Sequence, residues 1–311
     1  MSDPPFIAGN PSSIAAYRSR LIALRASYND LPLAEGMAFD LVLKSPPRNP
    51  SVTGVRPLQI SSAQLDVETR FALTKPLQIG SGYHSQVWMA QPLSSTPDQT
   101  GSLVLKFVIP SYIKLPSTYL EESEVRLGQY LFPANSVEYA AAAYEKLPEL
   151  QGSSLPYFYG VHNVNMHWGE TVFILAMEYI AGPSLADLQK VIDSENSTSK
   201  YCDFNVYRGL FHMALDVVRA AHAKDVYHID IRGQNILIDE ENDHPVFIDW
   251  QNVTIQWAVG PLGVTIPNPF ITQEYIDMQH LMSTFYDSKH HNERMVKYIA
   301  AELPDVERYW V

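Results

Sequence analysis

The sequence predicts an α+β protein in which a small β-sheet with one helix precedes a larger helical part. Its 311 residues correspond to about two domains, or to one unit with two parts, at roughly 150 residues per domain. The composition, 46% hydrophobic and 18% charged, is typical of a globular chain. Short β-rich runs dominate the residues before about 180, and helical periodicity dominates those after about 205. This order is typical of the α+β class.

The first 64 residues are predicted to form an extension with one helix and a Pro-rich linker. Apolar residues between 14 and 24 repeat at spacings of three and four, which predicts a helix capped by Ser12 or Ser13. Its opposite side carries Arg18, Arg20 and Arg25. Residues 45–57 are rich in proline, which can sustain neither a helix nor a central strand.

Residues 65–180 and 181–311 are predicted to be the β-rich part and the helical part. Strands are expected at 77–79, 86–90, 103–109 and 171–179, with an Ala-rich helix at 136–147. The second part begins its regular structure with a helix at 207–224, and its end is mostly helical. Two short strands, 236–238 and 246–248, follow that helix.

Charge and cysteine usage narrow the class of partner and the compartment. The chain has 22 Lys and Arg against 34 Asp and Glu, a net charge of −12, which disfavours nucleic acid and anionic membrane surfaces as partners. Cys202 is the one cysteine and cannot form an intrachain disulfide, which suits a reducing compartment. The start of the chain does not resemble a signal peptide, and no apolar stretch approaches the length of a membrane span. We therefore expect a soluble, cytoplasmic protein.

One group of polar residues carries the strongest chemical signal. His228, Asp230 and Asn235 follow one another in a short segment, and Asp249 comes directly after the β-like run at 246–248. Each acid alone is more often a solvated turn residue. Phosphoryl transfer needs a carboxylate to orient the attacking hydroxyl and oxygen ligands to hold Mg²⁺. The combination therefore favours phosphoryl transfer.

These residues resemble motifs of the protein-kinase-like superfamily. The segment His228–Asn235 resembles its catalytic loop, H-x-D-x-x-x-x-N, and Asp249 stands where the metal-binding Asp of D-F-G stands. Residues 79–87 resemble the Gly-rich loop, residues 103–106 resemble V-A-I-K, and residues 176–185 resemble the hinge. The motifs occur in family order over roughly residues 70–290.

The resemblance implies a two-lobed protein-kinase-like fold with a β-rich N-lobe and a shortened helical C-lobe. The chain resembles a divergent, fungal-type protein kinase-like domain, and this resemblance implies ATP and Mg²⁺ as cofactors. By that match the catalytic residues are Asp230, Lys106 and Arg232, and Asn235 and Asp249 hold the metal. The nucleotide-binding residues would be Gly80, Gly82, Val87, Lys106, Met177 (the gatekeeper), Glu178 and Ile180.

The sequence departs from the family pattern at several positions. The helix position that should carry a Glu is Ala140 or Ala141, which leaves Glu138 or Glu145 as a partner for Lys106. Ser85 replaces the third glycine of the loop, His228 is not followed by Arg, and D-F-G reads Asp-Trp-Gln. Asp277 is a candidate residue for the helix that supports the catalytic loop in the family. The alternative, a carboxylate on the surface of a helix, is about as common.

The leading hypothesis is an ATP-dependent phosphotransferase, a divergent protein kinase acting on Ser/Thr hydroxyls. The alternative enzyme is a small-molecule kinase, because Ile-Asp-Trp also resembles aminoglycoside and choline phosphotransferases. The non-enzyme alternative is a pseudokinase that binds nucleotide or acts as a scaffold. The expected partners are ATP and a hydroxyl-bearing protein or small-molecule acceptor.

Overall fold

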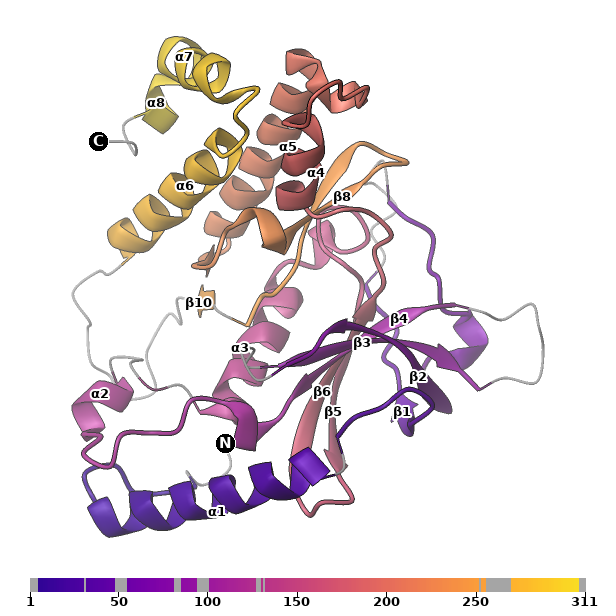
Figure 1. Ribbon diagram of the computed structural model, residues 1–311, viewed down its shortest axis with the longest axis vertical. Helices are drawn as coiled ribbons and strands as arrows, with labels where there is room; N and C mark the ends of the chain where they lie inside the picture. Colours follow the sequence, from indigo (N-terminus) through magenta and orange to yellow (C-terminus); the bar gives the residue numbers. More distant parts are fainter. Residues whose placement is uncertain are drawn as a thin grey trace. The chain divides into compact units, whose positions relative to one another are not determined.

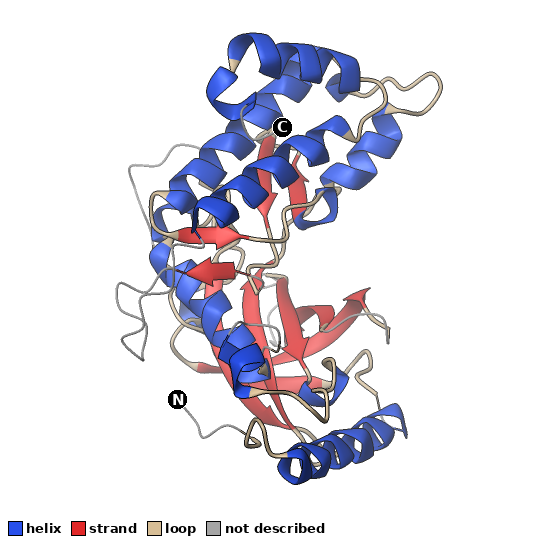
Figure 2. Ribbon diagram, turned by 90° about the vertical axis from the view of Figure 1, so that its left-hand side faces the viewer, coloured by secondary structure: helices blue, strands red, loops and turns tan. Residues whose placement is uncertain are grey.

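The computed structural model describes residues 5–30, 32–47, 55–80, 85–93, 101–126, 130, 132–251, 253–255 and 270–307. The chain divides into two compact units. The first contains Met1–Pro46, Leu58–Glu138 and Phe158–Tyr179, and the second contains Pro47–Pro57, Tyr139–Tyr157 and Ile180–Val311. Strands predominate in the first unit and helices in the second (Figures 1 and 2). The predicted combination of a β-rich part with a helical part is therefore confirmed, and the sheet is antiparallel.

The first unit is built on an antiparallel sheet of six strands, in the order β1-β2-β3-β4-β6-β5. Alternating burial along β1 and β3 places apolar side chains on one face, as a half-buried strand requires. β4 is buried along almost its whole length, because it lies in the middle of the sheet. The strands are β1 (Ala38–Val42), β2 (Glu68–Gln78), β3 (Gln86–Pro92), β4 (Leu103–Val108), β5 (Phe158–Asn165) and β6 (Thr171–Glu178).

The two edges of this sheet are linked just beyond β1. The Lys44 backbone N–H donates to the Tyr159 carbonyl on β5 at 2.8 Å. Gly160 on the same strand has a φ of +111°, and a Cβ there would lie 3.4 Å from the Lys44 side chain. The sheet therefore curls until the chain that leaves one edge strand pairs with the other, which covers part of an exposed edge.

A long N-terminal helix, α1 (Pro11–Asp30), packs against the first unit. The predicted helix is confirmed, but the predicted cap at Ser12 or Ser13 is wrong. Asn10 is the cap, because its side-chain oxygen accepts the Ser13 N–H at 3.0 Å and its carbonyl accepts the Ile14 N–H. Asn is a strong N-cap residue and Pro11 suits the first helical position, where no N–H is needed.

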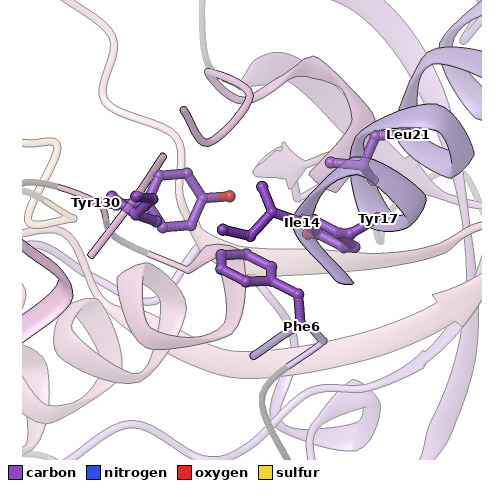
Figure 3. Close-up of a cluster of buried hydrophobic side chains, with 6 residues drawn as sticks. Phe6, Ile14, Tyr17, Leu21 and Tyr130 are labelled. Carbon is purple, nitrogen blue, oxygen red and sulfur yellow. The ribbon is translucent and has the colours of Figure 1, made fainter. Parts of the chain in front are cut away.

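The buried side of α1 joins an aromatic cluster. Figure 3 shows Ile14, Tyr17 and Leu21 projecting from this helix toward Phe6 and Tyr130. The ring centroids of Phe6 and Tyr17 are 5.1 Å apart, within the range of favourable aromatic contacts. The apolar repeat seen in the sequence is therefore a packing face within the first unit.

Polar contacts fix α1 to the segment that follows β4. Arg25 donates to the carbonyls of Ser111 and Ile113 at 2.6 and 3.2 Å. Arg18 donates to the Pro116 carbonyl. Tyr28, which is buried, accepts a hydrogen bond from the Gln86 side chain at the start of β3. Two of the three arginines that the sequence placed on the opposite side therefore bind main-chain carbonyls.

Two further helices belong wholly or partly to the first unit. α2 (Glu122–Arg126) lies within it. α3 (Pro133–Lys146) is divided, its first six residues counting with the first unit and the rest with the second. α3 confirms the Ala-rich helix predicted at 136–147.

The second unit surrounds two short antiparallel ribbons with helices. α5 lies beside α6 (Figure 1), and α5 also packs against β7 and β9. β7 pairs with β10, and β8 pairs with β9. The elements are α4 (Leu185–Ile192), α5 (Phe204–His222), β7 (Val226–His228), β8 (Ile236–Asp239), β9 (His244–Phe247), β10 (Val253–Ile255), α6 (Phe270–Tyr286), α7 (Asn292–Glu302) and α8 (Pro304–Glu307).

Arg56, at the end of the Pro-rich stretch, is held by the second unit. It donates to the carbonyls of Ser153 and Leu155 and lies 3.8 Å from the carboxylate of Asp239. The guanidinium is 10% exposed, so these contacts satisfy a nearly buried charge.

The turn before α4 depends on a glycine. A Cβ on Gly182 would lie 2.0 Å from the Ile238 carbonyl oxygen of β8. We expect Gly182→Ala to lower the free energy of unfolding by about 1–3 kcal/mol, since backbone must move to relieve the clash. Gly209 inside α5 has no atom within 4 Å of such a Cβ, so Gly209→Ala should instead stabilise by roughly 0.5–1 kcal/mol. Urea denaturation of both variants checks the contrast. Equal effects would contradict it.

Buried histidines should make stability depend on pH. Burial is the largest cause lowering the pKa values of His162, His244 and His291. The Nε2 atom of His291 bonds to the Tyr201 carbonyl, while its Nδ1 is buried without a hydrogen-bond partner among the described residues. Charging that ring in the folded state is therefore unfavourable.

We expect the free energy of unfolding to fall as the pH drops from 7.5 to 5.5. In the unfolded state these three histidines take up protons near pH 6.5, whereas in the folded state their lowered pKa values keep them neutral to a lower pH. The unfolded state therefore binds more protons in this range and is favoured as the pH falls. Carboxylates with lowered pKa values, such as Asp187, act below about pH 4 and lie outside this window. His291→Gln should reduce the slope, and His167→Gln, at an exposed position, should not. An unchanged slope for His291→Gln would refute the assignment.

Among the described residues, no helix has the length and apolar character needed to cross a membrane.

Candidate functional site

The segment from His228 to Asn235 connects β7 to β8 in the second unit, and both of its ends are anchored. The Ile248 N–H donates to the Asn235 carbonyl at 2.9 Å. The Nε2 of His228 donates to the Ile248 carbonyl at 2.9 Å. A carbonyl can only accept, so Nε2 carries the proton. These two bonds bring residue 248 beside Asn235, and Asp249 is the next residue in the chain.

Asp230 is oriented by two neighbours within this segment. The Asn235 side-chain nitrogen donates to the Asp230 carbonyl at 2.9 Å and to its carboxylate oxygen Oδ2 at 3.0 Å. The Arg232 guanidinium lies 3.3 Å from the same oxygen. The carboxylate is partly exposed, so it is held in one place while a hydroxyl group can still reach it.

Asp249 and Trp250 follow β9 with an unusual backbone. Asp249 has a φ of +64°, a left-handed conformation that few residues other than glycine adopt and that Asp tolerates better than most. Trp250 is buried beneath it. Its Nε1 donates to the Phe247 carbonyl at 3.1 Å, and its ring meets that of His228 edge-on at 4.6 Å. The tryptophan therefore ties the end of β9 to the start of the catalytic-loop-like segment.

Asp277 on α6 binds the start of this segment. Its Oδ2 accepts the His228 backbone N–H at 2.8 Å and lies 3.0 Å from His222 Nε2 at the end of α5. The side chain is 1% exposed. The sequence singled out Asp277 as a weak candidate for this role but gave no sign of His222, because the two are far apart along the chain.

Lys106 lies in the first unit, on β4 in the middle of the sheet. It faces Val87 on β3 and Leu175 on β6 in the strand register, and it is 6% exposed. Burying a lysine is costly unless its charge meets a partner. Lys106 is therefore not a lysine on an edge strand that reaches solvent. Glu138 and Glu145, the two candidates considered as its partner, are both exposed.

The other nucleotide-site candidates of the first unit lie near the strand ends. Gly80 follows β2 with a φ of +123°, and Val87 is half-buried on β3. Met177 and Glu178 are buried at the end of β6. Gly82 lies outside the described residues. Ile180, which is buried, belongs to the second unit.

The chemistry of Asn235 and Asp249 fits Mg²⁺. The Asn235 amide nitrogen donates both of its hydrogen bonds to Asp230. The amide oxygen Oδ1 of Asn235 can therefore serve as a metal ligand. Asp249 adds a carboxylate from the adjacent strand end. Over the described part of the chain, no group of three or more His, Cys, Asp or Glu side chains could hold a metal ion. Mg²⁺ bound with a nucleotide usually needs only one or two protein ligands besides phosphate and water.

Comparison with known proteins gives one weak similarity. No protein-family model matches this sequence. The chain is similar to Serine/threonine-protein kinase D from Synechocystis sp., with 25% identity over 199 residues. The match covers 64% of this chain and 33% of that protein, so the chain spans about a third of the length of its relative. The similarity hints at a kinase-like relationship.

Proposed function

We propose that this protein is an ATP- and Mg²⁺-dependent phosphotransferase that phosphorylates Ser/Thr hydroxyls of proteins. The observation that carries the proposal is the arrangement of Asp230, whose carboxylate is oriented by Asn235 and Arg232. Folding alone gives no reason to orient a partly exposed carboxylate in this way, and a group that receives a proton in catalysis needs such positioning.

In this proposal the second unit supplies the acceptor and metal chemistry. Asp230 orients the attacking hydroxyl and takes its proton as the γ-phosphoryl group leaves ATP, so that ADP and a phosphoester are formed. Asn235 and Asp249 would hold Mg²⁺, which when bound would neutralise phosphate charge. Arg232 places a positive charge beside the transferred group. Asp277 is a positioning residue, since it acts through the backbone of His228.

The first unit supplies the nucleotide contacts other than that of Ile180, which belongs to the second unit. Lys106 binds the phosphates, with Gly80 and Gly82 in the loop that covers them. The adenine contacts are made by Val87, by the gatekeeper Met177, and by backbone groups of Glu178 and Ile180. The similarity to a Ser/Thr kinase supports these roles, and it is also the reason to favour a protein acceptor over a small molecule.

A second candidate function is a pseudokinase that binds nucleotide without transferring phosphate. Glu138 and Glu145 are both exposed, so neither has the burial expected of a carboxylate that pairs with a buried lysine. This observation argues against Glu138 and Glu145 in the role of the usual helix glutamate, and Ser85 in place of the third loop glycine favours the same candidate.

The proposal is tested by ATP binding with and without Mg²⁺, measured by calorimetry. We expect Mg²⁺ to tighten ATP binding, and Asp249→Asn to abolish that gain. Asp225→Asn is the matched control, because Asp225 is exposed and has a similar φ of +57°. Transfer of labelled phosphate from ATP to a generic basic protein then separates the two candidates. Binding without transfer would favour the pseudokinase, and no binding at all would refute both.

A further inference from the structure

The first unit contains a cavity that none of the proposed catalytic residues lines. Its volume is about 220 Å³. α1 forms one wall through Tyr17, Leu21 and Leu24, and the start of α3 forms another through Phe132 and Pro133. Residues Glu170 to Phe173, around the start of β6, line a further side. The cavity therefore exists because α1 docks on this unit.

The apolar side chains that line the cavity are held in place by packing. Tyr17 and Leu21 belong to the buried aromatic cluster, whose packing fixes them from behind (Figure 3). Burial and the neighbouring Tyr17 raise the pKa of Tyr130, so both tyrosines stay neutral. Pockets for drug-sized ligands measure roughly 300–1,000 Å³. A cavity of about 220 Å³ thus suits a smaller ligand with a single ring or two fused rings.

Arg20 is the cation of the lining. It is exposed and makes no hydrogen bond or ion pair with any described residue. Arg18 and Arg25 on the same helix both bind main-chain carbonyls. An exposed guanidinium beside an apolar cavity complements an anionic group on a ligand whose body enters that cavity.

Glu170 adds one hydrogen-bond acceptor inside the cavity. This buried carboxylate accepts from the Ser111 N–H at 2.7 Å, the Ser111 hydroxyl at 2.8 Å and Trp168 Nε1 at 3.0 Å. A carboxylate offers about four lone-pair positions, so one remains for a ligand N–H or O–H.

We propose that this cavity binds a small aromatic acid: a flat ring system with one N–H or O–H donor for Glu170 and one anionic group for Arg20. The site goes beyond the proposed phosphotransferase function and does not depend on it. Because the cavity walls join α1 to the start of α3, a bound ligand stabilises the docked position of α1.

Indole-3-propionate is a suitable probe, because it has a fused ring, one N–H and one carboxylate. A titration of the full chain with labelled leucine methyl groups should show saturable shifts at Leu21 and Leu24. Amide exchange across α1 should slow when the probe is bound. The absence of saturable shifts up to about 10 mM would overturn the proposal.

Matched variants and analogues test each contact. Arg20→Gln should weaken binding about three- to tenfold, and Arg70→Gln, an exposed arginine elsewhere in this unit, should not. The neutral probe indole-3-propionamide should bind the unaltered chain about three- to tenfold more weakly than indole-3-propionate does. Its affinity should not fall further when Arg20 is replaced by Gln. 3-(1-Naphthyl)propionate, which lacks the ring N–H, should bind more weakly than indole-3-propionate. Equal binding of all three compounds would overturn the proposal.

Discussion

Replacing Asp230 with Asn should lower the rate of phosphoryl transfer by about 10²–10⁴-fold, the range expected for loss of a positioned proton acceptor. Asn keeps the shape of the side chain and one oxygen to accept the hydrogen bond from Asn235. It cannot accept the proton of the attacking hydroxyl. The affinity for ATP should therefore change little while the rate falls.

Single-turnover transfer from labelled ATP, compared with calorimetric ATP binding, separates these two effects. Asp225→Asn serves as the matched control, since Asp225 is exposed and lies just before β7. If Asp230→Asn kept more than about half of the original rate, the carboxylate would not be the proton acceptor.

Replacing Asp277 with Ala should destabilise the second unit by about 3–5 kcal/mol, the cost of breaking a buried, hydrogen-bonded charge arrangement. Its Oδ2 atom serves both the His228 N–H and His222. Without it, a buried donor at His228 loses its partner. The catalytic-loop-like segment loses the contact that fixes its start, so transfer should fall together with stability.

Urea denaturation followed by far-ultraviolet circular dichroism measures this effect. Asp216→Ala on the exposed side of α5 is the matched control and should change stability by less than about 0.5 kcal/mol. His222→Ala removes one of the two partners and should give an intermediate loss, which keeps the test informative if Asp277→Ala does not fold. A loss for Asp277→Ala no larger than that of the control would contradict the bracing role.

Much of the secondary structure could be predicted because its periodicity is strong. α3 and α5 carry an apolar stripe, the buried residues Ile14, Tyr17 and Leu21 of α1 recur at spacings of three and four, and β4 and β6 are β-rich runs. β5 could not be predicted in the same way. It is an edge strand in which three of the eight residues, His162, Asn163 and Asn165, are polar, and Gly160 lies inside it. An edge strand needs less apolar surface, so its sequence carries a weaker signal.

The positions of the candidate site residues were predicted, but the contacts that orient them were not. Spacing alone singled out Asp230, Asn235 and Asp249. It gave no sign that Asn235 would donate twice to Asp230, or that His222 would share the Asp277 carboxylate. These contacts depend on how α5, α6 and β7 pack, and packing joins residues that are far apart in the sequence.

The sequence by itself determined that a β-rich part precedes a helical part, which residues carry reactive side chains, and which face of α1 is apolar, because periodicity and residue type are local properties. Only the tertiary structure decided what each residue contacts. It showed that Asn10 caps α1, that Arg18 and Arg25 bind main-chain carbonyls, and that Arg20 is left beside a cavity. The physical reason is that an arginine's partner is set by which carbonyls the fold brings within reach, and that information is non-local.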